Sequence, residues 1–284
     1  MKKARKSVPP PAAKGLRYAR VAAAPHMVWS VIFIIAPLIF VAYYAFTTAD
    51  GTFTFENIFA LSEHAQTFWL SVCMSIIATF LCLLIGYPLA YCMSKTSPRT
   101  RNLLVMMMML PTWISLLIRT YSLMALLDNG GIVSGFLVKL GFEKLTFIGT
   151  EGAVILGMVY DFLPYMVMPI YNSVVKLDKR YTEAAHDLGC NGFQTLTKVV
   201  LPLTVPGIVS GVTMVFVPSI STFYISQKLG GGSFDLIGDT IERQFQNAIT
   251  YHTGAALSLV MMILILLSMA IMNRFSDGKE EMVV

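Results

Sequence analysis

Six long hydrophobic segments alternate with short polar connections along this chain of 284 residues. Each segment is close to the ~20 residues that a helix needs to cross the hydrocarbon core of a bilayer. The pattern predicts spans at approximately residues 27–47, 67–93, 103–127, 152–175, 200–226 and 255–273. Prolines occur inside or at the ends of several spans, which indicates kinked helices whose freed carbonyl groups find partners on neighbouring helices. We therefore predict an all-α polytopic membrane protein.

Composition supports this class. Hydrophobic residues make up 56% of the chain and charged residues only 13%, whereas soluble domains carry about 25% charged residues. The four cysteines form no Cys-x-x-Cys pair, and three fall within the second span, so we expect them to pack as small apolar side chains. The four histidines are scattered without the spacing of metal ligands, and no metal site is predicted.

The longest polar interruption runs over residues 176–206 and predicts two short helices separated by a turn. Asp178 is positioned to cap the first helix, and Gly189 ends it. Asn191 and Gln194 have the spacing of a capping box that begins the second helix. The unit closes at Pro202 and Pro206, and the first helix carries an apolar stripe of Leu177, Tyr181, Ala184 or Ala185, and Leu188. Such an amphipathic pair between two spans predicts a docking surface.

Basic residues gather on one side of the predicted spans. Seven precede the first span, three lie in the loop at 94–102, four in the polar loop at 176–206 and two in the C-terminal tail, against four in the other three loops: Lys139, Lys144, Lys228 and Arg243. The positive-inside rule places both termini in the cytoplasm. The first apolar run is too long for a signal-peptide core and is interpreted as a retained span. The predicted organisation is a basic segment at 1–26, a membrane domain at 27–275 and a tail at 276–284.

The sequence lacks the motifs of several catalytic classes. Its one Gly-Lys pair, Gly278–Lys279, is followed by Glu280, so the chain shows no phosphate-binding loop. It has neither His-Glu-x-x-His nor Gly-x-Ser-x-Gly, and we predict no catalytic residue and no enzyme activity of its own. A stand-alone secondary transporter would predict inverted internal repeats, and residues 27–127 and 152–273 show no convincing repeat.

Two ionisable residues, Arg119 and Asp161, fall inside predicted spans, where charges are costly and usually functional. On straight helices Arg119 lies about 24 Å from the cytoplasmic start of the third span, and Asp161 lies about 13 Å from the outer start of the fourth. Because the two distances are counted from opposite sides of the membrane, the two residues could lie at similar levels. Two interpretations stay open. In the structural interpretation, Arg119 pairs with Asp161 or snorkels outwards. In the functional interpretation, Asp161 lines a polar cavity and, with Tyr165 one turn on, receives a cationic solute.

Residues 183–202 resemble the Glu-Ala-Ala loop of the permease subunits of bacterial ABC importers. Glu183, Ala184 and Ala185 are followed at the family spacing by Gly189, and Val199 replaces the usual isoleucine before Leu201 and Pro202. In this family the loop, here 176–202, docks on a cytoplasmic ATPase. The resemblance implies that Glu183 makes a charged contact with the ATPase, that the alanines permit close approach, and that Gly189 reverses the chain.

About half of the chain also resembles spermidine/putrescine permease subunits, in the stretches 110–127, 161–189, 201–211 and 223–245. The resemblance implies a type I ABC importer permease of MetI-like fold in the bacterial inner membrane, with a polyamine as solute. Permeases for other small solutes share much of this pattern, so such a solute is the alternative. Candidate residues of the substrate pathway are Trp113, Arg119, Tyr121, Asp161, Tyr165, Phe223 and Tyr224.

The family further implies a set of partners. These are a cytoplasmic ATPase dimer, a second homologous permease, an extracytoplasmic solute-binding protein and membrane lipid. The ATPase binds ATP and Mg²⁺, so this chain is expected to need no cofactor. No nucleic acid is implied as a partner. We expect the loop at 227–251, with Asp235, Asp239 and Glu242, to touch the binding protein. Gly207 and Gly211 permit a close helix contact, for which the second permease is one candidate.

Overall fold

The computed structural model describes residues 25–48, 50–141, 146–247 and 249–280. Almost all of them are helical, and the extended pairing among them is confined to an isolated bridge between Thr47 and Phe53. The all-α prediction is therefore confirmed. The predicted basic segment at 1–26 lies almost wholly outside the described residues, as does the end of the predicted tail.

Four helices are long and apolar enough to cross a membrane alone: Pro25–Ala45, Glu56–Lys95, Glu151–Val175 and Tyr251–Arg274. The first includes a π-helical turn, Val31–Ile35, ahead of α2 (Ala36–Ala45), and the second joins α3 (Glu56–Phe59) and a 3-10 turn, Ala60–His64, to α4 (Ala65–Lys95). The others are α8 (Glu151–Val175) and the greater part of α15 (Tyr251–Glu280). These helices confirm four of the predicted spans.

The third span, predicted at 103–127 as a kinked helix, is broken into separate helices. α5 (Pro98–Met109) passes through a 3-10 turn, Leu110–Trp113, and stops. α6 (Leu116–Leu127) then starts in a new direction and leads to α7 (Ile132–Lys139), with a bend of 93° between the two halves. Pro111 lies in the tight turn and Ile114 leaves the helical region with ψ of 139°, which breaks the ladder of hydrogen bonds.

The fifth span is bent as well. α10 (Gly192–Thr195), a π-helical turn, Leu196–Val200, and α11 (Leu201–Leu203) form one segment, and α12 (Val205–Ser221) continues at 69° to it. The bend lies at Thr204, whose hydroxyl donates to the Val200 carbonyl at 2.9 Å. The predicted span at 200–226 therefore ends early, because Thr222 is extended and α13 (Tyr224–Leu229) is a separate short helix.

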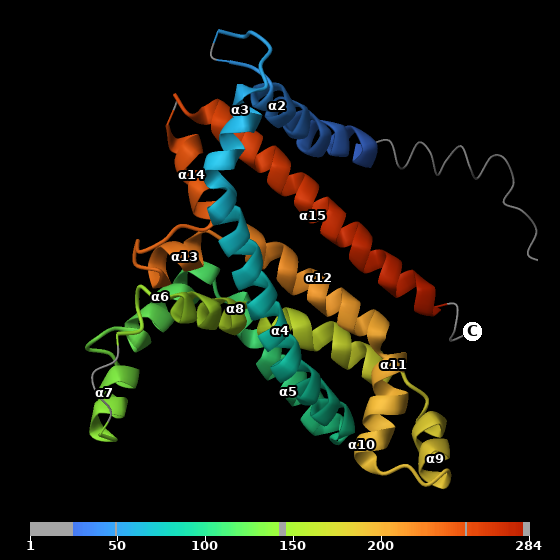
Figure 1. The fold of residues 1–284 in the computed structure, drawn as a ribbon. Coiled ribbons are helices and arrows are strands. Elements are labelled where there is room, and N and C mark those ends of the chain that lie inside the picture. The colour runs from blue at the N-terminus through green and yellow to red at the C-terminus, as the bar shows by residue number, and fades with distance from the viewer. Residues whose placement is uncertain (1–24, 49, 142–145, 248, 281–284) are drawn as a thin grey trace, which may run out of the picture.

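α8 is the central helix of the bundle, with α4 and α12 packed against it (Figure 1). Glycines permit this packing. A Cβ atom at Gly86 of α4 would lie 3.1 Å from Met166 Cγ, and one at Gly211 of α12 would lie 2.8 Å from Met166 Sδ. At Gly207 it would lie 2.4 Å from the Cβ of Ser173. The close helix contact that Gly207 and Gly211 predict is thus made with α8 of the same chain.

A second layer covers α12. α15 runs beside α12, and α2 packs on α15 at the edge of the molecule (Figure 1). α14 (Ile237–Gln246) fills the space between α12 and α15 at one end. α2 and the π-helical turn before it expose an apolar face that includes Phe33, Ile39 and Phe40, as expected for a helix that lipid or another membrane subunit covers. The core therefore lies along α8, and α2 is peripheral.

Gly207→Ala should destabilise the bundle, because the new methyl group would overlap Ser173 and the carbonyl oxygen of Pro169 at 2.9 Å. Overpacking of this kind costs about 1–3 kcal/mol. We expect a lower thermal unfolding midpoint for the purified protein in detergent. The matched control is Gly135→Ala in α7, where the added Cβ meets open space. Equal midpoints for the two variants would contradict the proposed packing.

Candidate functional site

The coupling segment, residues 176–202, follows directly from the end of α8 and folds as predicted. An Asp178 oxygen accepts a hydrogen bond from the Arg180 amide at 3.0 Å and begins α9 (Lys179–Asp187). Gly189 has φ of +83°, the left-handed conformation that reverses a chain after a helix. The Asn191 side chain accepts from the Gln194 amide at 2.8 Å, and the Gln194 side chain accepts from the Asn191 amide at 3.0 Å. Caps at both helix starts thus hold the segment in shape without a partner.

The apolar side chains of this segment mostly point away from the chain. Leu188 is 85% exposed and Phe193 74% exposed, and Tyr181 is exposed as well. Exposed aromatic and aliphatic side chains gathered on one short segment are typical of a surface that another protein covers. Glu183 and Ala184 are exposed beside them, whereas Ala185 is only 5% exposed and packs inwards. Leu201 and Pro202 are also exposed, at the start of the fifth span.

A cavity of about 140 Å³ lies between α9 and the adjoining ends of α4 and α5. Its polar lining includes Tyr91, Lys95, Arg101, Asp178 and Lys179. This space separates α9 from α4 and α5. α9 is therefore joined to the bundle mainly through the end of α8 and through its contacts with Leu196–Val200 at the start of the fifth span. A displacement of α9 would therefore be passed first to α8 and to the fifth span.

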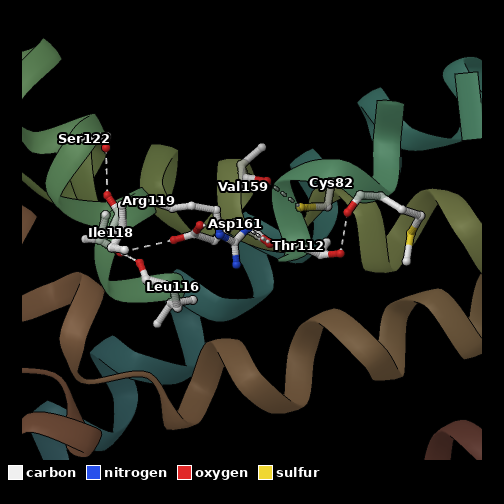
Figure 2. Close-up of polar contacts among 10 residues, drawn as sticks. Cys82, Thr112, Leu116, Ile118, Arg119, Ser122, Val159 and Asp161 are labelled. Atoms are coloured by element: carbon white, nitrogen blue, oxygen red, sulfur yellow. Dashed lines mark hydrogen bonds and ion pairs between the residues drawn. The ribbon is translucent and has the colours of Figure 1, made fainter. Parts of the chain in front are cut away.

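Arg119 of α6 and Asp161 of α8 form a buried ion pair (Figure 2). Arg119 Nη1 lies 3.1 Å from Asp161 Oδ1 and donates to the Asp161 carbonyl oxygen at 3.3 Å. The Thr120 hydroxyl donates to Asp161 Oδ2 at 3.3 Å. The two side chains are 5% and 0% exposed. Of the two interpretations left open by the sequence, the ion pair is the arrangement observed, and contact of Asp161 with a solute stays a prediction.

The straight-helix argument for this pair was wrong although the pairing itself was anticipated. Arg119 comes after the 93° bend, so it does not lie at the depth obtained by counting residues from the start of the span. It reaches Asp161 because α6, in its new direction, packs against α8. The bend in the third span therefore brings the charge to its partner.

The aromatic candidates are only partly brought together. Tyr121 and Tyr224 meet edge to face with ring centroids 5.9 Å apart, and Tyr165 lies 6.5 Å from Phe162. Trp113, at the end of the 3-10 turn, and Phe223 are exposed, and within the described residues neither meets another ring. A further residue was missed by the sequence argument. The Lys228 ammonium lies over the rings of Tyr121 and Tyr224, and its spacing of four from Tyr224 on a helix was the available signal.

The three acidic residues of the loop at 227–251 do not all lie on the surface. Asp239 is buried, and its Oδ2 accepts from the Leu236 amide at 2.8 Å at the start of α14, so it is not available to an external partner. Burial raises the pKa of Asp239 to about 6. Asp235 pairs with Arg243 at 2.6 Å, and Glu242 accepts from Gln227 at 3.0 Å, both on the surface. The exposed polar face of α14 therefore includes Glu242 and Arg243 but not Asp239.

The comparisons with known proteins agree with this architecture. Residues 82–280 match the family described as the binding-protein-dependent transport system inner membrane component. The chain belongs to this family. Among curated relatives in it, the spermidine/putrescine transport system permease protein PotB of Haemophilus influenzae is 40% identical over 84% of this chain and 87% of its own length. The PotB protein of Escherichia coli K12 is 36% identical over 87% of this chain and 94% of its own length.

Solved structures show the same fold in other members of such transport systems. A chain of a bacterial ABC transporter involved in import of the acidic polysaccharide alginate has a TM-score of 0.74 and 20% identity, covering 93% of this chain and 96% of its own. A chain of the MetNI methionine ABC transporter has a TM-score of 0.53 and 18% identity, over 77% and 95%. The predicted fold of an ABC importer permease is confirmed.

Asp161→Asn and Arg119→Gln should each destabilise this family member, because each leaves one charge buried without its counter-ion at a loss of about 3–5 kcal/mol. The double variant Arg119→Met with Asp161→Leu should recover most of the loss, since it removes both charges and keeps apolar volume. Thermal unfolding of the purified protein measures all three. A double variant that is less stable than both single variants would contradict a simple ion pair and indicate a further role for either group.

Proposed function

We propose that this chain is the permease subunit of an ATP-driven importer that moves polyamines, spermidine or putrescine, across the bacterial inner membrane. Identity of 36–40% to spermidine/putrescine permeases over most of the chain is the observation that carries the choice of solute. The exposed and doubly capped coupling segment supports the ATP-driven mechanism. A permease for another small solute is the alternative, and it is favoured by a relative named only as an inner membrane ABC transporter permease, YdcU, at 31% identity.

In the proposed mechanism, this subunit transmits a movement of the ATPase to the membrane-spanning helices. Glu183, Ala184, Tyr181 and Leu188 form the surface offered to a cytoplasmic ATPase dimer, which binds the ATP and Mg²⁺. Closure of the dimer would displace α9, and the direct connection of α9 to α8 through Asp178 would carry that displacement to the centre of the bundle. A second homologous permease would complete the pathway, and an extracytoplasmic binding protein would deliver the solute to it.

The orientation of the chain follows from charge. Lys95, Arg101 and Lys179 come together around the cavity beside the coupling segment, so basic residues from three connected elements meet at one end of the bundle. In membrane proteins, lysine and arginine are enriched in the loops on the cytoplasmic side. We assign this end, both termini and the coupling segment to the cytoplasm, and α7, α13 and α14 to the side that meets the binding protein.

Glu183→Lys should uncouple ATP hydrolysis from uptake without removing the protein from the membrane, because it reverses a charge on an exposed side chain of the ATPase-facing surface. Gly189→Asp should do the same by straining the turn at φ of +83°. Uptake by proteoliposomes and phosphate release, measured together, test both. Glu63→Lys, a charge reversal on an exposed side chain of the 3-10 turn Ala60–His64, is the control. Normal uptake by either coupling variant would contradict the assignment.

The choice of solute is tested with the complete transporter in proteoliposomes that contain its ATPase, its second permease and its binding protein. We expect ATP-dependent uptake of labelled spermidine or putrescine, and binding of the same compounds by the isolated binding protein. Uptake of an amino acid or a sugar in the absence of polyamine uptake would support the alternative permease. Uptake that persists when the ATPase is inactivated would overturn the ATP-driven mechanism.

A further inference from the structure

Lys228 is held by two aromatic rings. Its ammonium lies 5.2 Å from the ring centroid of Tyr121 on α6 and 5.7 Å from that of Tyr224 on α13. The rings themselves meet at an interplanar angle of 77°. Within the described residues the ion pairs join other groups, so the near neighbours of this ammonium are the two tyrosine side chains and not carboxylates. Tyr121 is 47% exposed, and the three side chains form one partly open cluster.

The chemistry of this cluster matches that of the proposed solute. Aromatic faces within about 6 Å attract a cation through the ring quadrupole, and they do so for any ammonium of suitable access. A lysine side chain is an ammonium on a flexible four-carbon stem. Putrescine is a four-carbon chain with an ammonium at each end, and spermidine contains the same aminobutyl group. Lys228 therefore presents to Tyr121 and Tyr224 the same group that a polyamine would present.

We propose that Tyr121 and Tyr224 form a transient binding site for a terminal ammonium of the transported polyamine, and that Lys228 fills this site when no solute is present. The inference rests on the polyamine function proposed above. A cation tethered beside the site acts at a high effective concentration and competes with the free solute. The site is thereby kept weak, as a pathway must be if the solute is to leave it again.

The position of the cluster suits a transient site. Tyr121 lies after the break in the third span, and Tyr224 opens the short helix that follows the end of α12. The rings thus belong to two short helices that contact each other and both pack against α8. Relative movement of α6 and α13 would separate the rings and release whichever ammonium lies between them.

The first test measures polyamine binding to the nucleotide-free complex of both permeases and the ATPase in nanodiscs, without the binding protein. Removal of the competitor in Lys228→Met should tighten putrescine binding about two- to fivefold. Tyr121→Leu and Tyr224→Leu in the Lys228→Met background should abolish the gain. Lys139→Met, a lysine of the neighbouring α7, is the control and should bind like the wild type. Unchanged affinity in Lys228→Met would overturn the inference.

A second test restores the tethered cation chemically. Lys228→Cys should bind putrescine as tightly as Lys228→Met, and 2-aminoethyl methanethiosulfonate should return it towards the wild-type affinity by attaching an ammonium of nearly the original length. Ethyl methanethiosulfonate attaches a neutral group of similar size and should not. The wild-type complex, treated with both reagents, controls for Cys73, Cys82, Cys92 and Cys190. Equal effects of the two reagents would show a steric role for Lys228 and refute competition.

The two proposals fail separately. If the complete wild-type transporter takes up no polyamine, the proposed function fails. If it takes up polyamine but neither Lys228 variant binds putrescine more tightly, only the inference about Lys228 fails. In the Lys228→Met background, Tyr121→Phe and Tyr224→Phe keep the aromatic faces and should retain the gain in putrescine affinity that the leucine variants lose. The thermal unfolding midpoints of all these variants show whether the cluster is intact.

Discussion

The close packing of α4 and α12 on α8 is the interaction on which the other features depend. Gly86, Gly207 and Gly211 remove side chains where the helices meet, so the backbones approach each other and Met166 fills the remaining space. In a bilayer, close packing of this type replaces the hydrophobic effect as the main source of helix association. With its two neighbours fixed this way, α8 can connect the coupling segment at one end to Asp161 in its interior without bending independently of the bundle.

The same helix explains why a charge pair can be kept inside the protein. Asp161 is fully enclosed, and its carboxylate receives Arg119 and Thr120 from a single turn of α6. Because α6 exists as a separate helix only after the break at Ile114 and Ser115, the bend and the ion pair depend on each other. A straight third span would carry Arg119 away from α8, and the carboxylate would be left without its counter-ion. The pair therefore specifies the geometry of the bend.

The sequence was sufficient where the signal was local. The caps at Asp178 and Asn191, the turn at Gly189 and the apolar segments follow from the neighbouring residues alone, and they are found in the structure. Pro111 predicted a kink in the third span, but not the sharpness of the bend or its position at residues 114–115, because hydrophobicity continues through it. The burial of Asp239 and the meeting of Lys228 with Tyr121 depend on contacts between distant segments, which no local pattern contains.

The neighbouring alanines of the coupling segment face opposite ways, Ala184 outwards and Ala185 into its own chain. A single dipeptide therefore meets two different steric requirements. Additional bulk at Ala184 would leave the segment folded and change which surface fits against it. Additional bulk at Ala185 would tilt α9 relative to the residues it packs against in its own chain. It would thereby change the direction in which a displacement of α9 is passed to α8. The fit to a partner and the orientation of α9 can thus change independently, each through one of two adjacent side chains.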